Sequence, residues 1–112
     1  MNKLKMFCVT LEPNHTKYIR NLNYTPVVLG NKSISKEYLS DRIGENISHK
    51  NKYYGEYTFH YWLWKNHLNK IEEKWIGFCQ YRKFWSLKFS SNDQINSENL
   101  KNKVLKEIPE EL

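Results

Sequence analysis

The stretch LKMFCVTL, residues 4–11, carries apolar and β-branched residues with almost no polar alternation, and it ends shortly before Pro13. A run of this kind is typical of a strand that is covered on both faces. TPVVLG, residues 25–30, and WIGFCQYRKFW, residues 75–85, have the same character, although the last becomes polar at its end. We therefore expect three strands of a buried sheet.

Helical patterns lie between and after these strands. In NHTKYIRNLNY, residues 14–24, apolar side chains recur at helical spacing. A longer helix is expected over residues 48–68, and because aromatic residues occupy almost its whole circumference it should lie inside the domain. Amphipathic spacing predicts a further helix at residues 100–108.

Short strands that alternate with helices predict βαβ units and a parallel sheet with helices on both faces. The expected fold class is therefore α/β, with a Rossmann-like, three-layer core around a short, mainly parallel sheet. At 112 residues the chain has room for one core. Gly55 weakens the long helix by about 1 kcal/mol relative to alanine, which predicts either a tight packing contact or the close approach of a ligand there.

Composition limits the binding partners and the cellular location that we expect for the chain. The net charge of +6 favours an anionic partner, but Lys and Asn are so frequent along the whole chain that a dedicated polyanion patch is not expected. No apolar run is long enough to span a membrane and no signal-peptide pattern is present, so we expect a cytoplasmic protein, with peripheral contact at the inner membrane face left open. We expect Cys8 and Cys79 to be reduced thiols that lie in the core.

The carboxyl ends of the strands are the expected place for a ligand. In open parallel sheets, ligands bind beyond these ends, where the connecting loops and helix N-termini meet. The sequence places residues 10–12 and 80–83 at two strand ends, and residues 41–52 in the loop and helix start that follow the remaining strand. A phosphate group would fit such a rim.

Two blocks of the sequence together resemble a known family. DRIGENISHKNKYYGEYTFHYWLWKN, residues 41–66, and WIGFCQYRKFW, residues 75–85, are similar to the paired signature of a bacterial capsular polysaccharide/lipopolysaccharide glycosyltransferase-like family, domain of unknown function 4422. Its members carry a D-N-x-G-x-N-I-S-x-K-N stretch, an E-L-T-x-x-Y-W-x-W-K-N helix and a G-x-x-H-Y-R-R-Y strand. The resemblance extends over residues 4–86.

The resemblance implies a nucleotide-sugar-dependent glycosyltransferase, or the donor-binding fragment of one, in bacterial surface polysaccharide biosynthesis. It also implies a GT-A-like core that is incomplete, because family members are much longer. Residues 1–88 would form the N-terminal part of that domain, and residues 89–112 a polar linker and amphipathic helix that begin its truncated continuation. The missing C-terminal half would come from the same or another chain.

Substrates and catalytic residues follow from the same resemblance. The donor would be a nucleotide diphosphate sugar, and the partner a glycan or lipid-linked acceptor. No D-x-D pair is present to hold a divalent metal, so we expect neither a metal nor another cofactor. Arg82 and Lys83 are the expected catalytic residues, standing in for the metal at the diphosphate leaving group, and Tyr81 is expected to stack on or hydrogen-bond the nucleotide.

The expected substrate-binding residues lie at the strand ends, in the loop after the second strand and at the start of the long helix. They are Thr10, Asp41, Asn46, Ser48, Asn51, Glu56, Gln80 and Tyr81.

The chain departs from the family pattern at Arg42, where Asn or Asp is usual, at Gln80, where His is usual, and at Lys83, where a second Arg is usual. Lysine keeps the charge but loses the planar fork that binds phosphate in two places.

Structural roles are the alternatives for several of these residues. Arg82 would equally suit an ion pair with Glu56 or Asp41 that holds strand to helix. Asp41, Glu45 and Asn46 would suit turns and caps. Glu56 and His60, four residues apart on one helix, would also suit a metal ion, or a base and its orienting partner.

Two other functions remain open. Lysines interleaved with aromatic residues in residues 50–62 and 80–85 suit a nucleic-acid-binding module, although the helical period is expected to bury those aromatic side chains. The third reading is a non-catalytic, truncated remnant that pairs with another chain.

Overall fold

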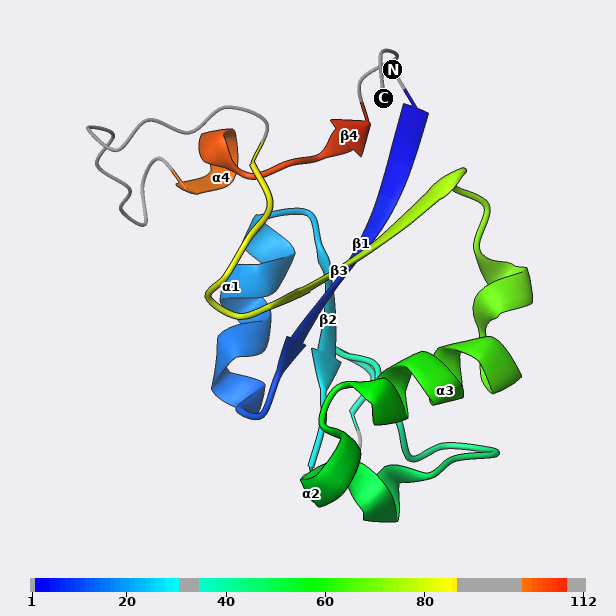
Figure 1. The fold of residues 1–112 in the computed structure, drawn as a ribbon. Helices are drawn as coiled ribbons and strands as arrows, with labels where there is room; N and C mark the ends of the chain where they lie inside the picture. The colour runs from blue at the N-terminus through cyan, green and yellow to red at the C-terminus, as the bar shows by residue number, and fades with distance from the viewer. Residues whose placement is uncertain (1, 31–34, 87–99, 109–112) are drawn as a thin grey trace.

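The computed structural model describes residues 2–30, 35–86 and 100–108. Strand β1 (Asn2–Thr10) lies at the centre of the sheet, between β2 (Thr25–Val28) and β3 (Trp75–Gln80), and both neighbours are parallel to it. The three predicted strands are therefore confirmed. The order β2-β1-β3 means that the chain passes first to one side of β1 and then to the other (Figure 1).

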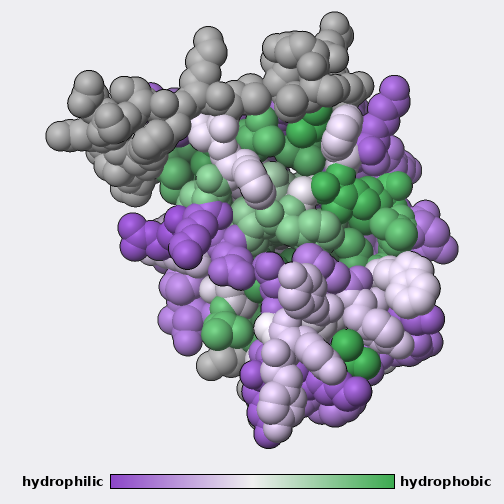
Figure 2. All heavy atoms as spheres, viewed as in Figure 1, coloured by the Kyte–Doolittle hydropathy of each residue, from purple (hydrophilic) through white to green (hydrophobic). Residues whose placement is uncertain are grey.

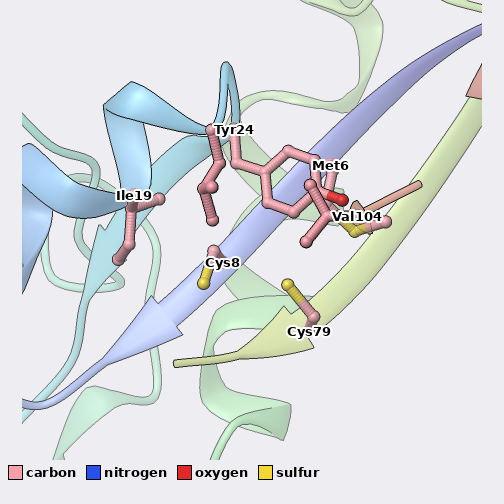
Figure 3. Packing of buried hydrophobic residues seen from close by; sticks show 7 residues of the cluster. Met6, Cys8, Ile19, Tyr24, Cys79 and Val104 are labelled. Carbon is pink, nitrogen blue, oxygen red and sulfur yellow. The ribbon is translucent and has the colours of Figure 1, made fainter. Parts of the chain in front are cut away.

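Helix α1 (Thr16–Asn21), which follows the short 3-10 helix η1 (Pro13–His15), covers one face of the sheet. Successive residues of a strand point to opposite faces, so every second side chain of β1 contributes to this side. The buried cluster on this face contains Met6, Cys8, Ile19, Leu22, Tyr24, Cys79 and Val104 (Figure 3).

Helix α3 (Tyr57–Asn66) covers the opposite face. The alternate side chains of β1 meet it there, and the ring centroid of Phe7 lies 5.4 Å from that of Phe59. This second buried cluster contains Phe7, Val9, Val27, Leu29, Phe59, Trp62 and Leu63. An open, mainly parallel sheet with helices on both faces confirms the predicted three-layer α/β class and is compatible with a Rossmann-like core.

Cys8 and Cys79 are paired neighbours in the register of β1 and β3, and both are free, buried thiols (Figure 3). The hydrogen bond with Cys79, together with burial, raises the pKa of the Cys8 thiol far above its ordinary value. Cys8 therefore stays protonated, and the two buried thiols act as small apolar packing residues, as the sequence predicts.

The long helix predicted over residues 48–68 is wrong as a single element. The chain forms η2 (Ser48–Lys50) and α2 (Asn51–Tyr54), breaks at Gly55, and continues as α3 and the short η3 (Leu68–Lys70). Gly55 has φ 58° and ψ −133°, a backbone conformation that favours glycine. A Cβ atom at this position would meet nothing within 4 Å, so conformation rather than tight packing explains the glycine.

The predicted burial of the aromatic helix is also wrong in part. Only Thr58, Phe59, Trp62 and Leu63 of α3 are buried, because only one side of the helix meets the sheet. Tyr57 and Trp64, which a helix lying inside the domain would bury, are 64% and 61% exposed. Figure 2 shows side chains of intermediate hydropathy covering the region of α2 and α3 at the surface.

The C-terminal helix predicted over residues 100–108 is much shorter than expected. Helix α4 (Leu100–Lys103) has a single turn, and β4 (Glu107–Ile108) then pairs antiparallel with the start of β1. Val104 and Ile108 are buried as apolar residues, but they reach the core from a turn and a strand. The predicted linker, which begins at residue 89 and precedes this helix, falls within residues 87–99 and so lies outside the described residues.

Candidate functional site

A cleft of about 610 Å³ opens at the carboxyl ends of β1 and β3. It lies where the strand order reverses, which is the position at which open α/β sheets bind their ligands. The volume falls in the range usual for small-molecule sites. Its walls are formed by Val9, Thr10, Leu11, Glu12, His15, Leu29, Asn51, Gly55, Glu56, Gln80 and Tyr81.

One wall of the cleft joins the ends of β1 and β3. Thr10, the last residue of β1, has its Oγ1 2.7 Å from Nδ1 of His15, and it also accepts the backbone N–H of Glu12 at 3.1 Å. The ring of His15 stacks on that of Tyr81 with centroids 4.3 Å apart and planes 24° apart. The backbone N–H of Tyr81 donates to the carbonyl of Val9 at 2.9 Å, which holds this wall to the sheet.

A second wall joins the end of β3 to the break between α2 and α3. Nε2 of Gln80 donates to Oε2 of Glu56 across 3.2 Å. Nδ2 of Asn51 donates to the carbonyl of Gly55 at 2.8 Å and to Oγ1 of Thr58 at 3.1 Å. Both hydrogens of the Asn51 amide are thereby used, so its carbonyl oxygen remains to accept a hydrogen bond from a ligand.

The polar atoms of the cleft are mainly acceptors. Glu12 and Glu56 contribute carboxylates, and Asn51 and Gln80 contribute amide oxygens. Neither Lys nor Arg occurs among the described residues that line it. Such a surface suits hydroxyl groups, which donate hydrogen bonds, better than it suits phosphate oxygens.

A smaller cavity of about 290 Å³ adjoins the cleft and shares Glu56 and Gln80 with it. Lys83 and Trp85 both line this second cavity, and Nε1 of Trp85 donates to the carbonyl of Phe78 at 2.8 Å. Arg82 is exposed and lines neither cavity. Among the described residues, Arg82 forms no ion pair with Glu56 or Asp41, so the alternative of a buried ion pair is wrong.

Asp41 lies behind the cleft, fully buried. Its Oδ2 accepts the hydroxyl hydrogen of Thr58 at 2.5 Å, and Thr58 in turn accepts from Asn51. Within the part of the chain that is described, Oδ1 of Asp41 has no hydrogen-bond partner. The carboxylate therefore supports a wall of the cleft and does not line it.

Asn46 and Ser48 shape the loop that precedes η2. Nδ2 of Asn46 donates to the carbonyls of Arg42 and Gly44, and Oδ1 accepts from the backbone and the hydroxyl of Ser48 at 3.1 and 3.0 Å. These are the turn contacts that the sequence offered as an alternative to ligand binding. Neither residue lines the cleft.

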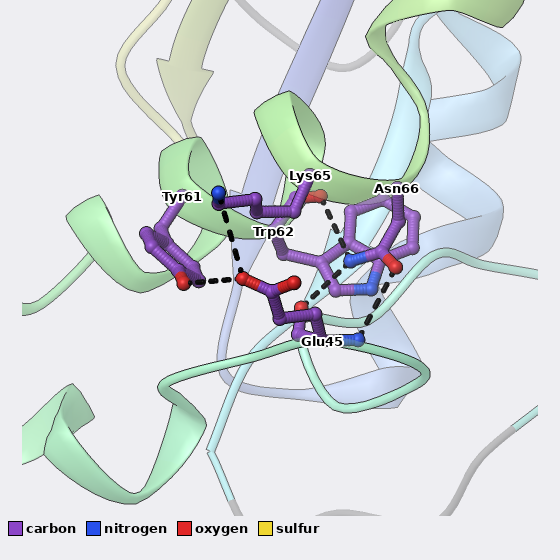
Figure 4. Close-up of polar contacts among 5 residues, drawn as sticks. All are labelled: Glu45, Tyr61, Trp62, Lys65 and Asn66. Atoms are coloured by element: carbon purple, nitrogen blue, oxygen red, sulfur yellow. Dashed lines mark hydrogen bonds and ion pairs between the residues drawn. The ribbon is translucent and has the colours of Figure 1, made fainter.

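The same loop is fastened to α3 through Glu45 (Figure 4). The hydroxyl of Tyr61 donates to Oε2 of Glu45 at 2.7 Å, Nζ of Lys65 lies 3.6 Å from the same oxygen, and Nδ2 of Asn66 donates to the Glu45 carbonyl at 2.7 Å. The bond from Tyr61 lowers the pKa of the Glu45 carboxyl. Trp62 donates from Nε1 to the carbonyl of Ile43 at 2.5 Å.

The structure thus brings together five of the ten predicted site residues in the cleft: Thr10, Asn51, Glu56, Gln80 and Tyr81. His15 is a lining residue that sequence reasoning missed. The signal was present, because a histidine five residues after the end of β1 lies within reach of Thr10 when the chain turns at Pro13.

Residues 7–111 match the model of a protein family described as Domain of unknown function (DUF4422). The chain belongs to this family. No curated protein and no solved structure matches it. The DUF4422 match includes every strand end and loop that forms the cleft.

Two further properties of this DUF4422 chain concern metals and membranes. Across residues 2–30, 35–86 and 100–108, no three His, Cys, Asp or Glu side chains gather in a group that would hold a metal ion. His60 packs on Phe78, with ring centroids 4.2 Å apart, while Glu56 accepts from Gln80. No helix within those residues has the length and apolar character to cross a membrane.

Proposed function

We propose that the chain is a nucleotide-sugar-dependent glycosyltransferase, or the donor-binding part of one, acting in bacterial surface polysaccharide biosynthesis. The cleft at the reversal of strand order carries this proposal. It has the position of a ligand site in an open α/β sheet, a suitable volume, and walls rich in hydrogen-bond acceptors.

The arrangement of charges supports a binding mode in which the sugar and the diphosphate of the donor lie in two different cavities. The sugar would occupy the large cleft, where Asn51, Glu56 and Gln80 would accept hydrogen bonds from its hydroxyl groups. The diphosphate would lie toward the adjoining cavity, which Lys83 lines, and the exposed Arg82, which lines neither cavity, would have to turn toward the diphosphate from the surface. In this role the two cations would stabilise the leaving group as the glycosidic bond to phosphate breaks.

A panel of donors tests the proposal. The whole chain is titrated by calorimetry with UDP-glucose, UDP-galactose, UDP-N-acetylglucosamine and GDP-mannose, each beside its nucleoside diphosphate and its free sugar. Binding of at least one intact donor is expected, and Glu56→Ala should weaken it about tenfold or more, the loss expected for one hydrogen bond to a charged group. Glu72→Ala, an exposed acidic site outside the cleft, is the matched control and should leave the affinity unchanged.

One observation favours a second function, the binding of single-stranded nucleic acid. Tyr53 and Trp64 are exposed, and Nζ of Lys52 and of Lys65 lies 5.0 and 4.0 Å from their respective ring centroids. Aromatic rings beside cations can stack on bases and neutralise phosphates. Binding of oligo(dT) or oligo(U) that Trp64→Ala abolishes, with no binding of any nucleotide sugar, would replace the glycosyltransferase proposal by this one.

A further inference from the structure

His15 is held in the wall of the cleft with its ring fixed on two sides. Nδ1 is engaged with Thr10 Oγ1, and one face of the ring is covered by Tyr81. Among the described residues, none forms a hydrogen bond with Nε2 of His15. One nitrogen of an oriented imidazole is thus left for a ligand.

The surroundings of Thr10 permit the form of His15 that accepts a proton. Thr10 Oγ1 has two lone pairs, and the backbone N–H of Glu12 occupies one of them. The second can accept Nδ1–H of His15, which leaves an unprotonated Nε2. When Nε2 takes up a proton, the bond from Nδ1–H to Thr10 is retained, so the ring keeps its orientation in both protonation states.

The carboxylates of the cleft are less suited to this task. Glu12 is exposed on the segment that follows β1, and Glu56 already accepts a hydrogen bond from Gln80 in the second wall. A general base works best when its reacting atom is held within hydrogen-bond reach of the proton it removes. The contacts with Thr10 and Tyr81 hold the His15 ring in one orientation at the wall of the cleft, which is the first requirement of such a base.

We propose that His15 is the proton acceptor of the transfer reaction and that Thr10 is its positioning residue; this inference rests on the proposed function. The acceptor oxygen forms a bond to the anomeric carbon of the donor, and the bond from that carbon to the diphosphate oxygen breaks. The electron pair of the broken bond leaves with the nucleoside diphosphate, and the hydroxyl proton of the acceptor passes to Nε2 of His15.

The first experiment observes the imidazole directly. The chain has four histidines, and His→Gln variants of the whole chain assign their ¹⁵N resonances after labelling with ¹⁵N-histidine. Saturation with the donor identified by calorimetry is expected to shift the Nε2 resonance of His15. The resonances of His49, which is exposed and outside the cleft, should not move.

The second experiment separates proton transfer from a structural role. Release of nucleoside diphosphate from the bound donor is measured with sugar acceptors for the wild type and for His15→Ala. The variant should lose at least about 100-fold in rate, the usual contribution of a general base, with donor affinity changed less than about threefold. Added imidazole should restore part of the rate in His15→Ala and have no effect on His49→Gln.

The outcomes distinguish the inference from the function on which it rests. If no nucleotide sugar binds, the proposed function fails and the inference fails with it. Donor binding can also stand while the inference is overturned. This is the result if the His15 resonance stays in place when a donor binds, or if the wild type cleaves no bound donor. It is also the result if His15→Ala keeps its rate or is not rescued by imidazole.

Discussion

Thr58 donates its hydroxyl hydrogen to Oδ2 of Asp41 across 2.5 Å, between two fully buried side chains. The bond ties the first turn of α3 to the loop that follows β2. Thr58 also accepts from Asn51, whose amide lines the cleft. A contact outside the cleft thus fixes the position of one of its walls.

Replacing Thr58 by valine removes the hydroxyl while keeping the shape of the side chain. Oδ2 of Asp41 then loses its partner in a buried site, and the free energy of unfolding should fall by about 1–3 kcal/mol. Urea unfolding measures the change. Thr25→Val, in β2, is the matched control and should alter stability by less than about 0.5 kcal/mol; equal effects of the two substitutions would contradict the role of the buried bond.

Gly55→Ala should destabilise the protein through its backbone alone. The residue has φ 58°, and a Cβ atom there would meet no neighbour within 4 Å, so steric crowding is not expected. Holding alanine in this conformation costs about 1–3 kcal/mol. Thermal unfolding should show this loss, whereas Lys52→Ala in the preceding turn should be neutral. An unchanged midpoint for Gly55→Ala would mean that α2 and α3 can join as one helix without penalty.

Asn66→Ala should loosen the loop that precedes η2. Asn66 donates to the carbonyl of Glu45 at 2.7 Å and accepts from its backbone N–H at 3.3 Å. Loss of these contacts should lower the free energy of unfolding by about 1–2 kcal/mol and speed hydrogen exchange at the Glu45 amide. The control is Asn69→Ala, an exposed change in η3. Equal protection of the Glu45 amide in the two variants would contradict this prediction.

His67 should make stability depend on pH. Desolvation, with smaller contributions from Lys70 and Lys5, lowers the pKa of His67 below its ordinary value of 6.5. The unfolded chain then binds more protons than the folded one, so stability is fully present above pH 6.5 and is lost as the pH falls through the folded pKa. Urea unfolding at pH 7.5 and 5.5 measures this loss, which His67→Gln should reduce and His49→Gln should leave intact. A loss of the same size in His67→Gln would assign it to other groups.

The sequence alone determined the class of fold and the edge of the sheet at which the cleft opens. The apolar run LKMFCVTL, residues 4–11, predicts a strand that is buried on both faces. In a parallel sheet the carboxyl ends of all strands lie at the same edge, so the polar residues that end the predicted strands are expected there. Thr10, Gln80 and Tyr81 follow from that rule, because they end strands whose direction the pattern fixes.

Tertiary contacts decided which side chains of the aromatic helix are buried and where the helix breaks, which local periodicity could not predict. A helix that is aromatic on all sides has no unique apolar face, so the choice of Trp62 over Trp64 for the core depended on where the sheet lies. The sequence predicts a packing contact or the approach of a ligand at Gly55, whereas its backbone conformation accounts for the break in the helix. Asp41 could serve a ligand or a turn, and only the three-dimensional approach of Thr58 assigned it to the interior.

His15 illustrates the same division between local and distant information. Its position after β1 is local, but its stacking on Tyr81 joins residues 66 positions apart, since parallel strands bring their ends together regardless of their separation in the chain. Hydrophobic patterning therefore determined the three strands and the class of fold, but not the extent of the helices. Which polar side chains share the cleft was decided by the tertiary structure, because it depends on the order of the strands in the sheet. Short-range sequence patterns do not encode strand order.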